Sequence, residues 1–254
     1  APPLFINGFR SVNGRTELNI QTKHELSPKW TTSLFLHGNQ RKKKTDQNKD
    51  GFLDMPLSQQ INILNRWQFI DPEKGWVGFA SLRYLKDEKQ VGQLNFDPEI
   101  HQFGNLMWGG ELKTDKWDMT LKTGYVFPEI PYRSFGFQSA VSQHKQKGYF
   151  GNNIYDVSYT SYFHHLVYQS IIGNTLNKFK TGLQYMADIY DETVLGTEIH
   201  RNETNIGGFF EYSYDSQEQF NMILGLRLDY HNMLGSCITP RVQRGYAFAE
   251  HPTI

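Results

Sequence analysis

The chain has 254 residues, with 26 Lys and Arg balanced by 26 Asp and Glu, so its formal net charge is zero. A neutral chain offers no basic footprint for nucleic acid, and that class of function is set aside. Cys237 is the one cysteine, which excludes an intrachain disulfide framework and a cysteine-rich metal site. No apolar run approaches the ~18 residues of a membrane helix. The opening APPLFING has no basic or apolar region typical of a signal peptide. A processed protein or a fragment would look the same.

Period-two alternation of apolar and polar residues recurs along the chain, and helical periodicity is nearly absent. The segment RTELNIQTKHEL places Leu18, Ile20, Thr22 and Leu26 on one side of a strand. The segment SYFHHLVYQS is apolar or aromatic on both sides, so its faces stay unassigned. The other alternating segments are INILNRWQF from Ile61, KFKTGLQYMADI from Lys178, IGGFFEYSY from Ile206 and FNMILGLRLDYH from Phe220.

Many of these strands are about ten residues or longer, whereas ordinary globular strands have ~5–6. A strand that crosses a membrane in a barrel needs ~9–11 residues, with an apolar outer face and a polar inner one. The pattern therefore predicts an all-β, antiparallel transmembrane barrel, and the alternative is a soluble antiparallel sandwich with one wet face. Aromatic residues near the strand ends fit the interfacial girdles of a barrel: Trp30, Trp67, Tyr125, Phe127, Tyr212, Tyr214 and Tyr230.

Short turns and longer loops are expected to alternate, as in outer-membrane barrels with short periplasmic turns and long external loops. Residues 105–127 are predicted to form one long strand, because a turn at Lys113 to Lys116 would break this alternation. The predicted short turns are Ser27 to Lys29, Asp71 to Gly75, Pro128 to Pro131, Gly173 to Asn177 and Asp215 to Gln219. The predicted longer loops are 39–58, 87–104, 145–157 and 190–203, with smaller ones near Gly14 and from His231 to Gly235.

The loop DQNKDGFLDMP carries alternate oxygen-bearing side chains followed by a glycine, a pattern typical of calcium loops. Leu57 stands at the twelfth position, where an EF-hand has glutamate, and no helices flank the loop. The sequence therefore predicts a loop-type calcium site rather than an EF-hand, and an ordinary polar loop is the alternative. The candidate ligands are Asp46, Asn48, Asp50 and Asp54, with Gly51 at the turn.

Other chemical groups give weak signals. His164 and His165 are adjacent on a strand, so they face opposite sides and cannot chelate one metal together. Cys237 is expected to be a packed thiol. No nucleophile elbow or glycine-rich phosphate loop is present, so an enzyme is not expected. Four charged side chains, Lys180, Glu211, Arg227 and Asp229, could line a passage or could simply be solvated on a wet wall.

Five stretches together resemble the barrel of TonB-dependent outer-membrane receptors. They are GRTELNIQTKHELSPKW, DQNKDGFLDMP, KTGYVFPEIPYRSFGFQ, YQSIIGNTLNKFKTG and GLRLDYHNMLGSCITPR. The nearest resemblance is to receptors of Bacteroidetes-type bacteria that are grouped with cobalamin and siderophore receptors. It extends over nearly the whole chain.

This resemblance implies a barrel of about 22 strands around a plug, in the outer membrane, with energy delivered by the TonB–ExbB–ExbD complex. Residues 1–254 would form roughly half of such a barrel, with the plug and the TonB box outside them. The implied function is active uptake of a scarce nutrient such as an iron–siderophore, haem or cobalamin. The alternatives are a passive porin-like or structural barrel and a soluble β-rich binding module.

Overall fold

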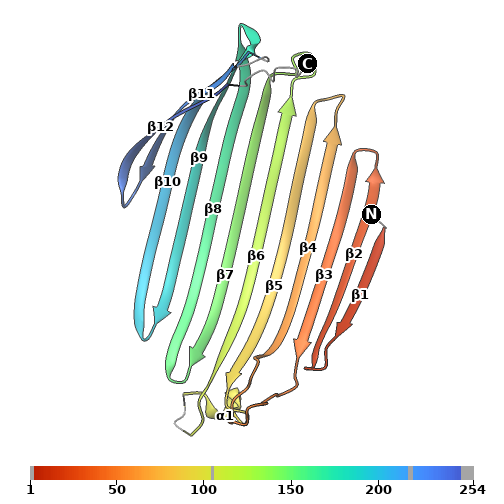
Figure 1. Cartoon of the computed structure of the whole chain (residues 1–254), viewed down its shortest axis with the longest axis vertical. Helices are drawn as coiled ribbons and strands as arrows, with labels where there is room; N and C mark the ends of the chain where they lie inside the picture. Colours follow the sequence, from red (N-terminus) through yellow and green to blue (C-terminus); the bar gives the residue numbers. More distant parts are fainter. Residues whose placement is uncertain (1–2, 104–105, 217–219, 247–254) are drawn as a thin grey trace, which may run out of the picture.

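The computed structural model describes residues 3–103, 106–216 and 220–246. They form one antiparallel sheet of twelve strands, in which each strand pairs with its neighbours in chain order (Figure 1). The strands are β1 (Leu4–Arg10), β2 (Arg15–Ser27), β3 (Trp30–Arg41), β4 (Leu57–Asp71), β5 (Trp76–Gly92), β6 (Gly109–Val126), β7 (Ser134–Phe150), β8 (Asn153–Ile172), β9 (Asn174–Val194), β10 (Thr197–Asp215), β11 (Phe220–His231) and β12 (Gly235–Tyr246); a short helix, α1 (Pro98–His101), lies between β5 and β6.

The cross-strand register sorts the side chains into an apolar face and a polar face. Ile20 pairs with Leu36, Leu36 with Ile63, and Ile63 with Tyr84, so one row of apolar side chains crosses four strands. On β11, Leu224, Leu226 and Leu228 belong to the same face. Because side chains alternate along each strand, the polar residues of the same strands line the opposite face. The alternation read from the sequence is therefore confirmed.

The apolar face is not a packed core. Leu183, Ile206 and Leu228 are 62%, 57% and 52% exposed, and no second sheet or helix layer of the described chain covers them. Buried apolar side chains occur instead beneath the longer connections, as at Phe96 and Tyr149, which are 3% and 4% exposed. This arrangement excludes the sandwich interpretation, because a sandwich buries one face of each sheet against the other. No helix in the described residues is long and apolar enough to cross a membrane.

The connections divide between the two ends of the sheet, with the longer ones and α1 at the lower end of Figure 1. The turns predicted at Ser27 to Lys29, Asp71 to Gly75 and Pro128 to Pro131 are present at the other end. The turn predicted from Gly173 to Asn177 is tighter, because β9 already begins at Asn174. The turn predicted at Asp215 to Gln219 includes residues 217–219, which lie outside the described residues.

Two predicted loops are wrong. Residues 145–157 and 190–203 are mostly strand, and the chain reverses only at Gly151–Asn152 and Leu195–Gly196. Their polar residues were taken as loop residues, but they pair across the hairpins, as Lys145 does with Ser158. The predicted loop 39–58 is present with narrower bounds, 42–56, and the predicted loop 87–104 is displaced along the chain to 93–108, because β5 continues to Gly92 and β6 begins at Gly109. The predicted long strand is confirmed as β6, in which Lys113 to Lys116 are paired on both sides.

Candidate functional site

The polar face carries charged side chains where β9 to β12 meet. Glu211 pairs with Lys180 in register, and its carboxylate lies 3.5 Å from the Arg241 guanidinium. Arg227 donates two hydrogen bonds to Asp229, at 2.6 and 2.7 Å. The four charged residues predicted to line a passage, Lys180, Glu211, Arg227 and Asp229, therefore share one face. Each of them lies near a side chain of opposite charge. Such pairing is expected of a lined passage and of a simply solvated wall alike.

Glycines on this face make room for the larger side chains. A Cβ on Gly182 would lie 2.5 Å from the Phe209 ring, and one on Gly207 would lie 2.2 Å from an Asp229 oxygen. The side chains of Phe209 and Asp229 thus lie against the backbone of Gly182 and Gly207, and any residue larger than glycine at those two positions would displace them. The result is a shallow groove of about 350 Å³ bordered by His165, Gln184, Phe209, Glu211, Arg227 and Arg241.

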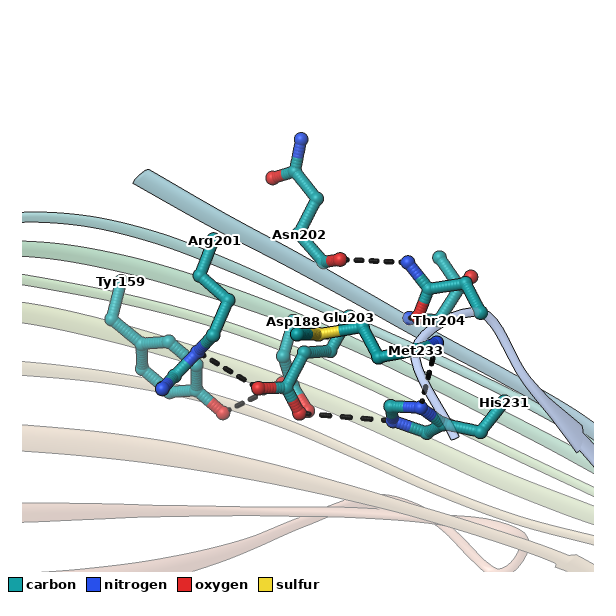
Figure 2. A network of polar contacts seen from close by, with 9 residues as sticks. Tyr159, Asp188, Arg201, Asn202, Glu203, Thr204, His231 and Met233 are labelled. Carbon is teal, nitrogen blue, oxygen red and sulfur yellow. Dashed lines mark hydrogen bonds and ion pairs between the residues drawn. The ribbon is translucent and has the colours of Figure 1, made fainter. Parts of the chain in front are cut away.

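A network of carboxylates lies further along the same wall (Figure 2). Asp188 and Glu203 are direct cross-strand neighbours, an arrangement in which like charges repel. Each has its own donor: Tyr159 donates to Asp188 at 2.7 Å, and Arg201 lies 2.8 Å from Glu203. His231 adds a third contact, 3.7 Å from Glu203. These donors offset the repulsion between the two carboxylates, so Asp188 and Glu203 can occupy directly opposite positions on neighbouring strands.

Toward the hairpin tips, beyond this network, the wall becomes aromatic. The Tyr159 and Tyr190 rings stack with centroids 4.6 Å apart, and the Arg201 guanidinium lies 4.3 Å over the Tyr190 ring. Tyr155 and Ile199 continue the same face toward the hairpin tips and are 38% and 41% exposed. We call these five side chains the aromatic shelf. It offers flat apolar surface beside a cation, a combination suited to stacking and to anionic groups.

The shelf was missed by the sequence analysis because residues 145–157 and 190–203 were taken as loops. The signal was present, since Tyr155, Val157 and Tyr159 alternate with polar residues as strand residues do. Pairing of Tyr159 with Tyr190, and of Tyr190 with Arg201, could not be read from one strand at a time.

The predicted calcium ligands lie in the exposed connection between β3 and β4. Their carboxylates accept hydrogen bonds from the loop's own backbone: Asp46 from the N–H groups of Asp50 and Gly51, and Asp54 from that of Gln47. Asn48 donates to Asp50 at 2.8 Å. Within the described residues, no group of three or more His, Cys, Asp or Glu side chains is placed to hold a metal ion. Calcium binding by Asp46, Asn48, Asp50 and Asp54 stays a prediction.

This connection packs against the one between β5 and β6. Leu53 donates to the Gly92 carbonyl at 2.9 Å, Leu94 donates to that of Gly51 at 2.8 Å, and the Phe52 ring lies 6.1 Å from that of Trp108. The loop that carries the aspartates is thus attached to its neighbour rather than free.

The connection between β5 and β6 builds a small core of its own over the sheet. The Phe96 ring fills the space above Gly109, where a Cβ would lie 2.3 Å from it. Tyr149 is buried beside Phe103, with ring centroids 5.1 Å apart. The Tyr149 hydroxyl has no hydrogen-bond partner among the described residues, and burial raises the pKa of its phenol. In the register, Gly109 and Tyr149 belong to the same face of the sheet as Tyr84 and Trp117, so this core lies on the apolar-face side, near the hairpin tips.

The predictions for two histidines and for the cysteine have different outcomes. His164 and His165 face opposite sides of β8, as expected: His164 stacks with Tyr185 on the apolar face, and His165 contacts Phe209 on the polar face. Cys237 is exposed, so the expectation of a packed thiol is wrong. It lies on the edge strand β12, which has no further strand beside it among the described residues.

Comparisons with known proteins give matches of fold alone. No protein-family model and no curated protein sequence matches the chain. Among solved structures, the siderophore receptor PirA from Pseudomonas aeruginosa has a TM-score of 0.68 at 9% identity, over 97% of this chain and 40% of that one. The chain has the fold of part of a TonB-dependent receptor barrel.

Two further structures agree with this assignment of the fold. The alcaligin outer membrane receptor FauA from Bordetella pertussis gives a TM-score of 0.69 at 10% identity, over 93% of this chain and 39% of that one. A ferric enterobactin receptor (PfeA) variant from Pseudomonas aeruginosa gives 0.62 at 10% identity, over 97% and 41%. The chain spans about 40% of the length of these receptors, so the fold predicted from the sequence, a partial receptor barrel, is confirmed.

Proposed function

We propose that the chain forms part of the wall and mouth of an outer-membrane receptor that actively imports a scarce nutrient. The observation that carries this proposal is a sheet whose apolar face is uncovered while its other face is polar, in a fold shared with siderophore receptors. In such a barrel the apolar face meets lipid and the polar face lines the interior. The similar proteins are receptors and a transporter by name, which supports transport rather than catalysis.

The mouth is the part that would first meet the nutrient. The aromatic shelf faces the same side as the interior wall and stands beyond the apolar belt. Tyr159 and Tyr190 can stack on a flat ligand, and Arg201 can neutralise an anionic group on it. Iron–siderophores, haem and cobalamin all present flat or anionic surfaces, and the choice among them would lie with the mouth and the interior together.

The proposal includes a source of energy for the transport. Transport would require the TonB–ExbB–ExbD complex, acting on a plug within the barrel. Uptake of a labelled iron–siderophore, haem or cobalamin should be lost when the gene is deleted and when TonB is removed. Uptake that survives loss of TonB would favour the alternative, a passive porin-like barrel, and no uptake of any candidate would favour a structural barrel.

The contribution of the shelf can be tested separately. The Tyr190→Ala and Arg201→Gln variants should each weaken nutrient binding roughly ten- to hundredfold, because stacking and charge neutralisation are lost. Tyr162→Ala is the matched control, since Tyr162 lies nearby on the apolar face of β8. Equal binding by all three variants and the unchanged protein would remove the shelf from the binding site.

A calcium ion in the loop between β3 and β4 would stiffen the connection that borders the mouth. Calorimetric titration with calcium should give a binding signal for the unchanged protein and none for Asp50→Ala. Asp191→Ala, at the tip of a different hairpin, serves as the control and should bind as the unchanged protein does. The absence of a signal from the unchanged protein would end this proposal.

A further inference from the structure

Arg41, the last residue of β3, carries a charge that no described residue balances. It makes no ion pair with another described residue, and its Nε atom is buried without a hydrogen-bond partner among them. Arg133 also has a buried Nε without a partner, but its guanidinium lies 5.6 Å from the centroid of the Phe127 ring. Because a charged donor that is buried and unpaired is costly, Arg41 is a residue whose partner is missing.

The cross-strand register places two more cations beside Arg41. Arg15 of β2 lies directly opposite Arg41, Ser58 of β4 lies opposite Arg41 on its other side, and Lys89 of β5 lies opposite Ser58. Directly opposite side chains share one face of the sheet, and like charges in such positions repel. We call Arg15, Arg41, Ser58 and Lys89 the cationic row.

The two cations at the ends of the row have carboxylates of their own. Glu17 contacts Arg15 on the same strand, and Asp87 lies 2.8 Å from Lys89 on the same strand. Arg41 stands between these two ion pairs and shares neither of them. The row therefore keeps its net positive charge at Arg41.

The cationic row belongs to the polar face. Lys89 is six residues from Arg83 on β5, and an even spacing along a strand keeps side chains on one face. The register then leads across the sheet from Arg83 to Asp118, Ser142, Ser161 and Asp188.

A hollow of about 370 Å³ lies beside the row, where the 42–56 connection leaves β3. Arg41, Ser58 and Lys89 are among the residues that line it. The carboxylates of Glu88 and Glu111 also border it, but each has its own lysine, at 3.1 and 2.8 Å. The hollow therefore offers a small group access to an uncompensated guanidinium.

The acidic residues of the 42–56 connection have other partners. Asp46 and Asp54 accept hydrogen bonds from backbone N–H groups of the connection itself, and Asp50 accepts one from Phe52 at 2.8 Å. The connection packs instead toward residues 93–108. The partner of Arg41 must then come from outside the described residues.

We propose that the cationic row binds an anionic oxygen group, a carboxylate or a phosphate, of the imported nutrient. A guanidinium holds such a group through two parallel N–H···O bonds, and the Ser58 hydroxyl stands beside Arg41 as a further donor. The row thus selects an anionic nutrient over a neutral one. This inference rests on the proposed function, in which the polar face lines the interior of the barrel.

Anion binding by the full-length protein in detergent, measured by calorimetry, tests the site. The probes are citrate, which offers carboxylates, and inorganic phosphate. We expect the unchanged protein to bind at least one of them and Arg41→Gln to bind it roughly tenfold or more weakly. Arg133→Gln is the matched control, because it also removes a guanidinium with a buried, unpaired Nε, and it should bind as the unchanged protein does.

Thermal unfolding separates a binding role from a structural one. Without an added anion, Arg41→Gln should unfold at the same temperature as the unchanged protein or at a higher one, because repulsion from Arg15 is removed. The probe that binds should raise the unfolding temperature of the unchanged protein and leave that of Arg41→Gln almost unchanged. Arg41→Lys keeps the charge without the two parallel donors, so its affinity should lie between the two.

Three results would overturn the site: binding of neither probe, equal binding by the unchanged protein and Arg41→Gln, or a lower unfolding temperature of Arg41→Gln without an anion. The last would mean that another part of the full-length protein already balances Arg41. Failure of the proposed function would show differently, as anion binding that depends on Arg41 in a protein whose deletion leaves nutrient uptake unchanged.

Discussion

Two halves of the long strands β5 to β10 have opposite polarity on the same faces: the turn half, nearer the short turns, and the tip half, nearer the longer connections and hairpin tips at the lower end of Figure 1. In the turn half, the outer face of β9 carries Leu183, Tyr185 and Ile189. In the tip half, the same face carries Asp191 and Thr193. The inner face changes in the reverse sense, from the acidic Asp188 to the aromatic Tyr190.

Solvent accounts for this difference. In the proposed barrel, the turn half has hydrocarbon outside and a wet interior, so apolar groups face out. The tip half would meet water on both sides, and charged groups can occupy its outer face at little cost. Its inner face is then free to carry aromatic side chains, as the aromatic shelf does.

The largest expected effect tests the boundary between the halves. Leu183→Arg places a charge in the hydrocarbon and should lower the free energy of unfolding by about 2–4 kcal/mol. Thr193→Arg, on the same face of the same strand beyond the band, should change it by less than about 0.5 kcal/mol. Urea unfolding in liposomes measures both. Equal effects would contradict the placement of the boundary.

The next effect concerns the small core beneath the β5–β6 connection, in the tip half. Gly109→Ala would drive a methyl group into the Phe96 ring and should destabilise the β5–β6 connection by about 1–3 kcal/mol. Gly136→Ala is its control, because nothing lies within 4 Å of the added Cβ. Limited proteolysis should cut the 93–108 connection faster in the first variant only. Unchanged cleavage would show that this core does not hold the connection in place.

A smaller effect is expected within the inner wall. Tyr159→Phe removes the hydrogen bond to Asp188, a carboxylate that is only 8% exposed, and should cost about 1–2 kcal/mol. Tyr162→Phe removes the hydroxyl of a neighbouring tyrosine that makes no hydrogen bond to another described residue. Unfolding midpoints compared at fixed pH measure the difference. Equal loss in both variants would mean that the Tyr159–Asp188 contact contributes nothing.

The smallest effect is a pH dependence at the hairpin tip. His200 lies 2.8 Å from Asp191, and the hydrogen bond to this carboxylate raises the pKa of the imidazole. The contact therefore stabilises the tip below the ordinary histidine pKa of ~6.5 and is lost as pH rises through the raised value. The protection of the β9–β10 tip amides relative to their intrinsic hydrogen-exchange rate should fall over this interval, and Asp191→Asn should abolish the fall. Lower protection at the acidic end would reverse the assigned sign.

The sequence by itself determined the class of fold and most strand faces. Alternation along β2, β4, β9 and β11 was enough. A strand with an apolar environment on one face and a polar one on the other must alternate apolar and polar side chains every two residues. It also determined that Lys113 to Lys116 continue a strand, since a turn there would reverse every later strand. The polar run of residues 39–58 marked a true loop.

Only the tertiary structure decided the rest. SYFHHLVYQS has no polarity contrast, so the faces of Tyr162, His164 and Leu166 follow from their neighbours on β7 and β9. The hairpin tips read as loops because their many polar residues outweighed a short apolar alternation such as Tyr155, Val157 and Tyr159, and only pairing across each hairpin identified them as strand. The aromatic shelf and the Asp188–Glu203 pair exist only where separate strands meet, and cross-strand register is a property of the sheet rather than of any single segment.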